Sequence, residues 1–310
     1  MKRPWETFKA IPIRLTATNK MVDEEGKADL PYGRRQARTT ANAVDPVRGC
    51  PGGITNDGRG CPWGCYSCES MKRYHRIFHI PVSMILKPEL LRKDLENCPD
   101  DWIRFGINGD PGEDWNLTIQ VARIVRESGK TPVILSRLWT PPTEPQLSQM
   151  ANLGVVLHIS ICALDSYPAT SQRLLFLKKY QAIGGKGIMR LVTFVFTDPE
   201  HTRIQNDLYN YGGPVLEQPA RLQRTNPNWL KVTQSRYHPY HTYTDKTKTT
   251  RWWTAGPQFS GSSCGDGCTI CPNKCFTTPQ TIKTPAPNIT LKSNLYQDVQ
   301  TLPNIDILDE

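Results

Sequence analysis

No segment of this 310-residue chain contains the run of about 18 apolar residues that a membrane-spanning helix requires. The N-terminal stretch MKRPWETFKAIPIRL also lacks the apolar centre of a secretory signal. Hydrophobic residues make up only 38% of the chain, yet a charged fraction of 22% is not that of a disordered polymer. We therefore expect a cytoplasmic protein with no membrane partner. The composition excludes a collagen, a coiled coil and a small secreted scaffold.

Acidic residues are in deficit, because 29 Asp and Glu face 38 Lys and Arg and the formal net charge is +9. The length corresponds to one large or two modest domains. Residues 1–40 form a basic N-terminal extension with nine Lys or Arg and five Asp or Glu. We expect a core domain over residues 41–225 and a C-terminal region over 226–310, because the periodic pattern of the core ends near the GGP and NPN segments.

The core pattern alternates short apolar strands with helical segments. Strands are expected at residues 102–107, 131–136, 154–163, 187–196 and, as a last candidate, 228–233. Near-continuous apolar strands are typical of a parallel sheet that is buried on both faces. With about five or six β-α units, the fold is an α/β partial barrel or an open parallel sheet. In either form the functional groups lie at the carboxyl ends of the strands.

Ten cysteines are present, and seven of them lie in two tight groups. In a reducing compartment such spacings indicate metal or cluster ligands rather than disulfides. Cys98 and Cys162 are expected to be ordinary buried thiols. Cys50 has two open interpretations, a loop thiol or an additional metal ligand.

The first group is Cys61, Cys65 and Cys68, with the spacing C-x3-C-x2-C. Three thiolates can hold three corners of an iron–sulfur cube and leave the fourth iron open to a small molecule. Zinc is the competing metal, and it would require Cys50 or another residue as a fourth ligand.

The segment CPWGCYSC, followed by β-α units, resembles the signature of the radical S-adenosylmethionine (radical SAM) superfamily. An aromatic residue often precedes the third cysteine in that family, whereas here Ser67 holds that place and Tyr66 stands one earlier. The resemblance implies a partial (β/α)6 barrel of the TIM type and a 4Fe-4S cluster that binds S-adenosylmethionine (SAM). It also implies an external reductant such as a flavodoxin or a ferredoxin.

The resemblance also suggests which residues contact SAM. Asn108, Gly109 and Asp110 follow the strand at 102–107 and look like the family turn that receives the SAM amino group; an ordinary turn is the alternative. Ser136 and Arg137 end the next strand, where Arg137 could pair with the SAM carboxylate. The remaining candidates lie two apart on one strand, so that both face the same side, and the family often uses them for the ribose; they are His158 and Ser160. A core histidine is the alternative for His158.

The second group contains Cys264, Cys268, Cys271 and Cys275 and repeats the first spacing. Four thiolates can ligate an auxiliary 4Fe-4S cluster completely, and the stretch loosely resembles bacterial ferredoxin loops. Because this ligand set is closed, zinc is again an alternative.

Together these features predict an enzyme that cleaves SAM reductively to a 5′-deoxyadenosyl radical and abstracts hydrogen from a substrate. Residues 224–253 interleave six Lys or Arg with aromatic residues and contain a single acidic one, a composition that suits phosphates and unpaired bases. A base in DNA or RNA is therefore the first substrate candidate, ahead of a peptide and a small molecule. The alternative class is a non-enzymatic nucleic-acid-binding protein stabilised by zinc or clusters.

Overall fold

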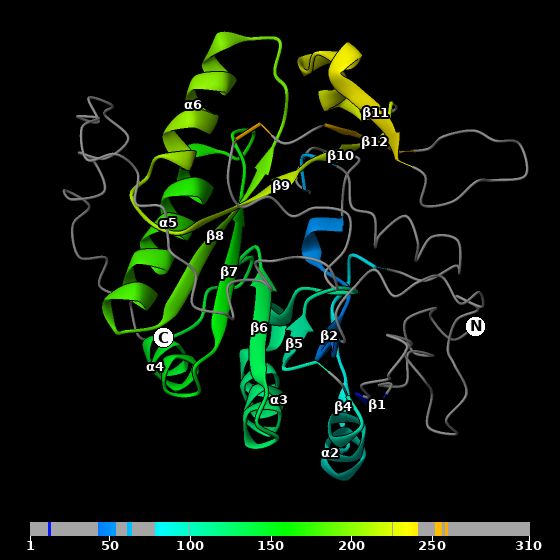
Figure 1. Cartoon of the computed structure of the whole chain (residues 1–310), viewed down its shortest axis with the longest axis vertical. Helices are drawn as coiled ribbons and strands as arrows, with labels where there is room; N and C mark the ends of the chain where they lie inside the picture. The colour runs from blue at the N-terminus through cyan, green and yellow to red at the C-terminus, as the bar shows by residue number, and fades with distance from the viewer. Residues whose placement is uncertain are drawn as a thin grey trace, which may run out of the picture.

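The centre of the molecule is a parallel β-sheet of five strands in the order β5-β6-β7-β8-β9. The computed structural model describes residues 12–13, 43–53, 61–63, 78–98, 100–224, 226–240, 252–255 and 258–259. The strands of the sheet are β5 (Trp102–Phe105), β6 (Thr131–Ser136), β7 (Val156–Ile161), β8 (Lys186–Thr193) and β9 (Val215–Pro219). The sheet curls like half of a barrel, and sequential order with parallel pairing confirms the predicted α/β class (Figure 1).

Helices connect the strands and cover the convex face of the curled sheet (Figure 1). They are α2 (Pro88–Glu96), α3 (Trp115–Glu127), α4 (Glu144–Asn152), α5 (Tyr167–Ala182) and α6 (Pro199–Tyr209). Polar side chains start two of them, because the carboxylates of Asp114 and Asp198 accept hydrogen bonds from backbone N–H groups of the first turn. In the described part of the chain, no helix is long and apolar enough to cross a membrane.

A further segment, residues 43–49, runs parallel to the edge strand β5. It forms isolated bridges from Ala43 to Arg104 and from Gly49 to Gly109, and its own residues Val47–Arg48 (β2) pair antiparallel with Val82–Ser83 (β3). One more residue lies between the two bridges on this segment than on its partner, so the pairing contains a bulge. Residues 43–49, which precede the segment of the first cysteine group, are therefore attached to the edge of the central sheet by two isolated bridges.

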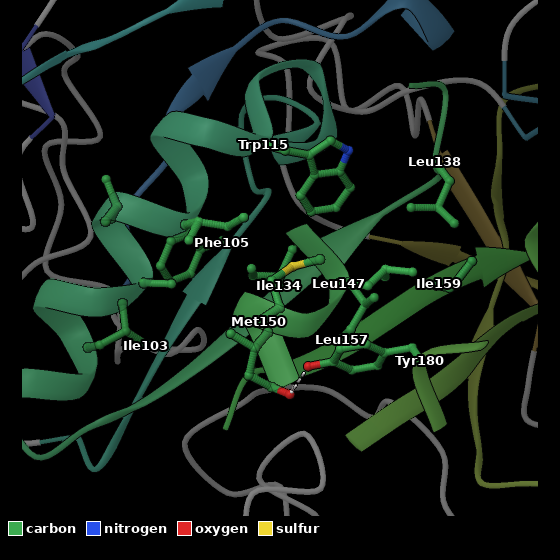
Figure 2. Packing of buried hydrophobic residues seen from close by; sticks show 14 of the residues in the cluster. Ile103, Phe105, Trp115, Ile134, Leu138, Leu147, Met150, Leu157, Ile159 and Tyr180 are labelled. Carbon is green, nitrogen blue, oxygen red and sulfur yellow. Dashed lines mark hydrogen bonds between the residues drawn. The ribbon is translucent and has the colours of Figure 1, made fainter. Parts of the chain in front are cut away.

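The core lies between the sheet and its helices. Leu157 and Ile159 point from β7 towards Met150 of α4 and Tyr180 of α5, and all four side chains are fully buried (Figure 2). The Tyr180 hydroxyl donates a hydrogen bond of 2.9 Å to the carbonyl of Val155, so its polar atom is satisfied in this apolar setting.

A second apolar layer covers the concave face of the sheet. It consists of alternate strand residues, namely Trp102, Val133, Leu135, Val156, Ile188 and Leu216. Because both faces are buried, the strands read as continuous apolar runs, which is why the sequence reveals their positions so well. The expected strands at 154–163 and 187–196 are confirmed with shorter limits, as β7 and β8.

The expected strand at 228–233 is wrong. Pro227–Lys231 form a 3-10 turn (η4), which Asn226 begins by accepting a hydrogen bond of 2.8 Å from the N–H of Asn228. A proline and an Asx turn override the apolar pattern of the following residues. A second short 3-10 turn, η5, covers Gln234–Arg236.

A small antiparallel sheet lies beyond β9 and crosses the expected domain boundary at 225/226 (Figure 1). Its strands, in spatial order, are β10 (Arg221–Leu222), β12 (Trp252–Ala255) and β11 (Tyr237–Tyr240). A two-residue strand pair, β1 (Pro12–Ile13) with β4 (Ile85–Leu86), joins the N-terminal extension to the core. Most of residues 1–40 and of 241–310 lie outside the described residues, so their expected organisation stays a prediction.

Replacing Leu157 with Ala tests the core directly. Leu157 is fully buried on the helix-covered face, so we expect the free energy of unfolding to fall by about 2–5 kcal/mol in urea denaturation. Leu230→Ala is the matched control, because Leu230 is 79% exposed and should change the stability by less than about 0.5 kcal/mol. Equal losses from both variants would contradict this packing.

Candidate functional site

Cys61, the first residue of the CPWGC segment, lies buried at the carboxyl-end edge of the sheet. Its N–H donates a hydrogen bond of 3.0 Å to the carbonyl of Gly52, and only 8% of the residue is exposed. Burial raises the pKa of its thiol, the charge of Arg137 opposes that shift, and Asp165 and Asp110 add to it. The sulfur therefore lies within electrostatic range of polar groups from three different strand ends.

Hydrogen bonds to Asp45, a residue of the parallel edge segment 43–49, hold the turn after β5 in place. The Asp45 carboxylate accepts hydrogen bonds from the backbone N–H groups of Gly106, Ile107 and Asn108 at 2.8–3.0 Å, and from the Asn108 side-chain amide at 3.0 Å. These bonds satisfy the donors that the bulge leaves without a strand partner. Asp45 thus replaces a stretch of backbone pairing.

Gly109 is required at the centre of this turn. A Cβ atom at residue 109 would lie 2.1 Å from the carbonyl oxygen of Val47 and 2.8 Å from that of Gly49. The N–H of Gly49 donates to the carbonyl of Asn108 at 2.9 Å, and the N–H of Asp110 donates to the carbonyl of Gly49 at 3.0 Å. The turn at residues 108–110, which the sequence predicts to contact SAM, and residues 47–49, which lead to the first cysteine group, are therefore in direct backbone contact.

Asp110 joins this turn to the end of β6. One carboxylate oxygen accepts from the N–H of Gly112 at 2.9 Å and from the Ser136 hydroxyl at 2.6 Å, and the other accepts from the N–H of Arg137 at 2.9 Å. Burial raises the pKa of Asp110, and these hydrogen bonds oppose the shift. With 4% exposure, the carboxylate binds its own chain, so a cofactor amino group would meet the backbone of the turn first.

Arg137 belongs to a buried charge network with Asp165 and Arg173. The guanidinium of Arg137 pairs with Asp165, whose other oxygen lies 3.1 Å from Nη1 of Arg173 and accepts the N–H of Cys162 at 2.8 Å. Nε of Arg173 also donates to the carbonyl of Arg137 at 2.7 Å. Burial lowers the pKa of Arg137, but Asp165 together with Cys61 and Cys162 outweighs burial, and the net shift is upward, so the guanidinium stays charged.

Two tryptophans enclose the Arg137 guanidinium. Its central carbon lies 4.5 Å from the ring centre of Trp63, in the cysteine segment, and 5.5 Å from that of Trp139. Gly52 allows the close approach of Trp139, since a Cβ there would lie 2.6 Å from the indole. The described residues of the first cysteine group's segment, 61–63, thus pack against the residues that follow β6. This segment is also bound to the turn η4, because the Asn228 side-chain amide donates to the carbonyl of Pro62 at 2.7 Å.

Three buried hydrogen-bond donors of Arg137 and Trp139 have no partner among the described residues. They are Nε and Nη1 of Arg137 and Nε1 of Trp139. Buried donors of this kind are costly unless an acceptor fills the space beside them. Beside a cysteine, sulfide, thiolate and carboxylate acceptors fit them, so the residues present are compatible with an iron–sulfur cluster and with the carboxylate of SAM.

The other predicted SAM contacts lie on the concave face of β7. His158 and Ser160 share the side of Val156, as the alternation predicts, and His158 is fully buried. Arg190, one strand along, donates through Nε to the side chain of Gln218. His158 and Ser160 lie one strand away from β6, which ends just before Arg137, and Arg190 lies two strands away, opposite Ser160.

Several predicted ligands lie outside the described residues: Cys65, Cys68, Cys264, Cys268, Cys271 and Cys275. Cys50, Cys98 and Cys162 are buried cysteines that form no disulfide in the described part of the chain, and Cys98 and Cys162 are buried as expected. Within the described ranges, no three metal-ligating side chains come together, since only the first cysteine of the group belongs to them.

Sequence reasoning missed Asp45, Asp165, Arg173 and the seating role of Trp63 and Trp139. Asp165 carried a usable signal, because it follows the apolar run of β7 at the edge where parallel strands place functional groups. Asp45 and Arg173 carried none, since their partners are 61–63 and 36 residues away in the chain.

Asp110→Ala tests the junction between the turn and β6. Three buried donors lose their acceptor, so the free energy of unfolding should fall by about 3 kcal/mol or more. Asp207→Ala, which removes a surface partner of Arg203, should have a much smaller effect in the same denaturant titration. A loss of stability no greater than that of the control would show that the Asp110 bonds are unimportant.

No protein-family model matches the chain, and no curated protein or solved structure is significantly similar to it. The chemistry of the site is therefore the basis on which its function is inferred.

Proposed function

We propose that this protein is a radical SAM enzyme whose SAM-binding 4Fe-4S cluster is held by Cys61, Cys65 and Cys68. The observation that carries the proposal is the place of Cys61. It is buried at the carboxyl-end edge of a curled parallel sheet, within electrostatic range of Asp110, Arg137 and Asp165. The segment 43–49 adds two isolated parallel bridges at the edge of the five-stranded sheet, which is compatible with the proposed partial (β/α)6 barrel of the TIM type.

The chain supplies a distinct group for each part of SAM. Backbone carbonyl oxygens of the Asn108–Asp110 turn suit the amino group, because the Asp110 carboxylate is already bound to its own chain. Nε or Nη1 of Arg137, which have no partner among the described residues, could each donate a single charge-assisted hydrogen bond to the carboxylate. His158 and Ser160 lie where they could reach the ribose.

When bound, the cluster and SAM supply one-electron reduction and homolytic cleavage to a 5′-deoxyadenosyl radical, which takes hydrogen from the substrate. The protein's own residues hold SAM in position and exclude water from the site. The buried ion network keeps Arg137 charged and fixed in place, and Trp63 and Trp139 cover its two sides.

The C-terminal cysteines Cys264, Cys268, Cys271 and Cys275 are proposed to hold an auxiliary 4Fe-4S cluster, and a flavodoxin or ferredoxin is proposed as the reductant. Gln258 and Phe259, just upstream, bind the core: their N–H groups donate to the buried Glu217 carboxylate at 2.5 and 3.2 Å. Phe259 also stacks on Tyr209 with ring centres 3.9 Å apart. The segment that carries the second group therefore begins at a fixed point beside β9.

A base in DNA or RNA remains the first substrate candidate, on a smaller set of residues than the sequence suggested. Trp229 and Tyr237 are only 6% and 3% exposed and pack in the small-sheet core, so they are not available for stacking. Trp253 is half-buried, and Arg224 lies 4.3 Å above its ring. This Arg–Trp pair is the described surface on which a nucleic acid could lie, and a peptide or small molecule are the other candidates.

Cys61→Ala tests the cluster assignment. The wild-type chain, reconstituted anaerobically, should hold about eight irons, four for each cluster, and should form 5′-deoxyadenosine from SAM with dithionite. The variant should hold about four irons and form none. Cys98→Ala is the matched control, because Cys98 is a buried thiol of the core and should leave both values unchanged.

Two results would contradict the assignment. The first is 5′-deoxyadenosine formation at the wild-type rate in Cys61→Ala. The second is a protein that holds zinc alone and turns over no SAM, which would favour the non-enzymatic alternative.

Nucleic-acid binding is tested with DNA and RNA oligomers over a salt series. We expect affinity that falls steeply with salt and falls further, by about 10-fold, in Trp253→Ala, because base stacking is worth about 1–3 kcal/mol. Arg203→Gln is the control, since Arg203 is a surface arginine already paired with Glu200 and Asp207. Salt-independent binding, or equal effects of both variants, would leave a peptide as the better substrate.

A further inference from the structure

The network of Arg137, Asp165 and Arg173 contains two positive charges and one negative charge, and all three are buried. Their side chains are 8%, 4% and 4% exposed. By itself the network carries one net positive charge in a part of the molecule that water does not reach, and the buried carboxylate of Asp110, which accepts the backbone N–H of Arg137, offsets part of it. Buried charges are expensive unless a compensating charge lies nearby.

The hydrogen bonds that Asp165 accepts do not require the second positive charge, which Arg173 supplies. Asp165 already satisfies the N–H of Cys162 and one guanidinium, and Arg173 adds a second cation from α5. Burial and the charge of Arg137 both lower the pKa of Arg173, so the arrangement disfavours its own second cation. An anion beside the network would remove this conflict.

The anion's position is indicated by the surroundings of the network. Trp63 lies against Arg137 and is two residues from Cys61, and the N–H of Cys61 donates to the carbonyl of Gly52, the residue that packs against the Trp139 indole. Arg173 also lies 5.4 Å from the ring centre of Trp139, whose indole N–H has no partner among the described residues. The network and the cysteine share one buried compartment.

We propose that the Arg137–Asp165–Arg173 network sets the reduction potential of the iron–sulfur cluster bound through Cys61. The inference rests on the proposed function. One-electron reduction adds a negative charge to the cluster without making or breaking a bond, and a neighbouring positive charge favours that reduced form. Net charge, hydrogen bonds to sulfur and burial are the protein's means of tuning such potentials.

Substitutions in the network should be able to lower or raise the reduction potential, because the network contains both positive and negative charges. Removing Arg173 takes away a positive charge and should lower the potential. Removing the charge of Asp165 leaves more positive charge and should raise it. A purely structural role predicts that both changes act alike, through loss or loosening of the cluster.

The experiment uses Arg173→Gln and Asp165→Asn, neither of which is proposed to touch SAM. The full-length chain is reconstituted with iron and sulfide under anaerobic conditions and titrated with dithionite, the electron donor, while the reduced cluster is followed by electron paramagnetic resonance. We expect Arg173→Gln to lower and Asp165→Asn to raise the midpoint potential. Each change should alter the reduction equilibrium at least tenfold, which is about 59 mV for one electron.

Two further variants separate charge from structure. Arg173→Lys keeps the charge and should stay close to the wild-type potential even if it loses the planar contacts with Asp165. Arg203→Gln removes an exposed arginine of α6 and should have no effect. The C-terminal cluster is removed from the signal by measuring all variants in the background Cys268→Ala, Cys271→Ala.

Shifts in the same direction, or no shift in a protein that binds its cluster and cleaves SAM, would overturn the inference and leave the proposed function standing. A wild-type chain that binds no cluster at Cys61 would overturn both.

Discussion

The site depends on the close contact between two backbones, residues 47–49 and the turn at 108–110. The carbonyls of Val47 and Gly49 lie where a side chain at residue 109 would be, so the two segments can meet only through glycine. This contact fixes the point at which the chain leaves the sheet and enters the cysteine loop. Asp45 holds the same turn from the other side through three backbone N–H groups, so that the loop starts from a rigid base.

Carboxylates that bind their own chain build the rest of the site. Asp45, Asp110 and Asp165 each follow or flank a strand end, and each accepts hydrogen bonds from a neighbouring segment instead of facing a cavity. The result is a chain of connections from the edge segment to β5, then to β6 and to α5. The two arginines attached to the last carboxylate bring positive charge to the cysteine without exposing it to water. Rigid charges of this kind need no rearrangement when a neighbouring group changes its own charge.

The sequence allows the fold to be predicted better than the site. Strands such as β7 and β8 are mostly apolar and buried on both faces, and together with the alternation of strands and helices this identifies a parallel sheet. Ser136 and Arg137 were found because they end such a strand, and Asp110 because it follows one. The partners of these residues were not predictable, since Asp45 and Arg173 meet the site only through tertiary structure. The strand expected at 228–233 failed because a local turn at Pro227 was stronger than the apolar pattern. The aromatic residues of 224–253 misled because periodicity does not separate a packed tryptophan such as Trp229 from an exposed one.

The order of these residues along the chain has a consequence for biosynthesis. Cys61 leaves the ribosome first, whereas the residues that seat it extend to Arg173. At about 5–20 residues per second, the intervening stretch takes roughly 6–20 s to synthesise, and during that time the cysteines have no folded partner. Their thiols are open to oxidation and to the wrong metal throughout this interval. Insertion of the proposed cluster after the release of α5 would meet a complete seat, whereas insertion during the synthesis of the cysteine segment would not.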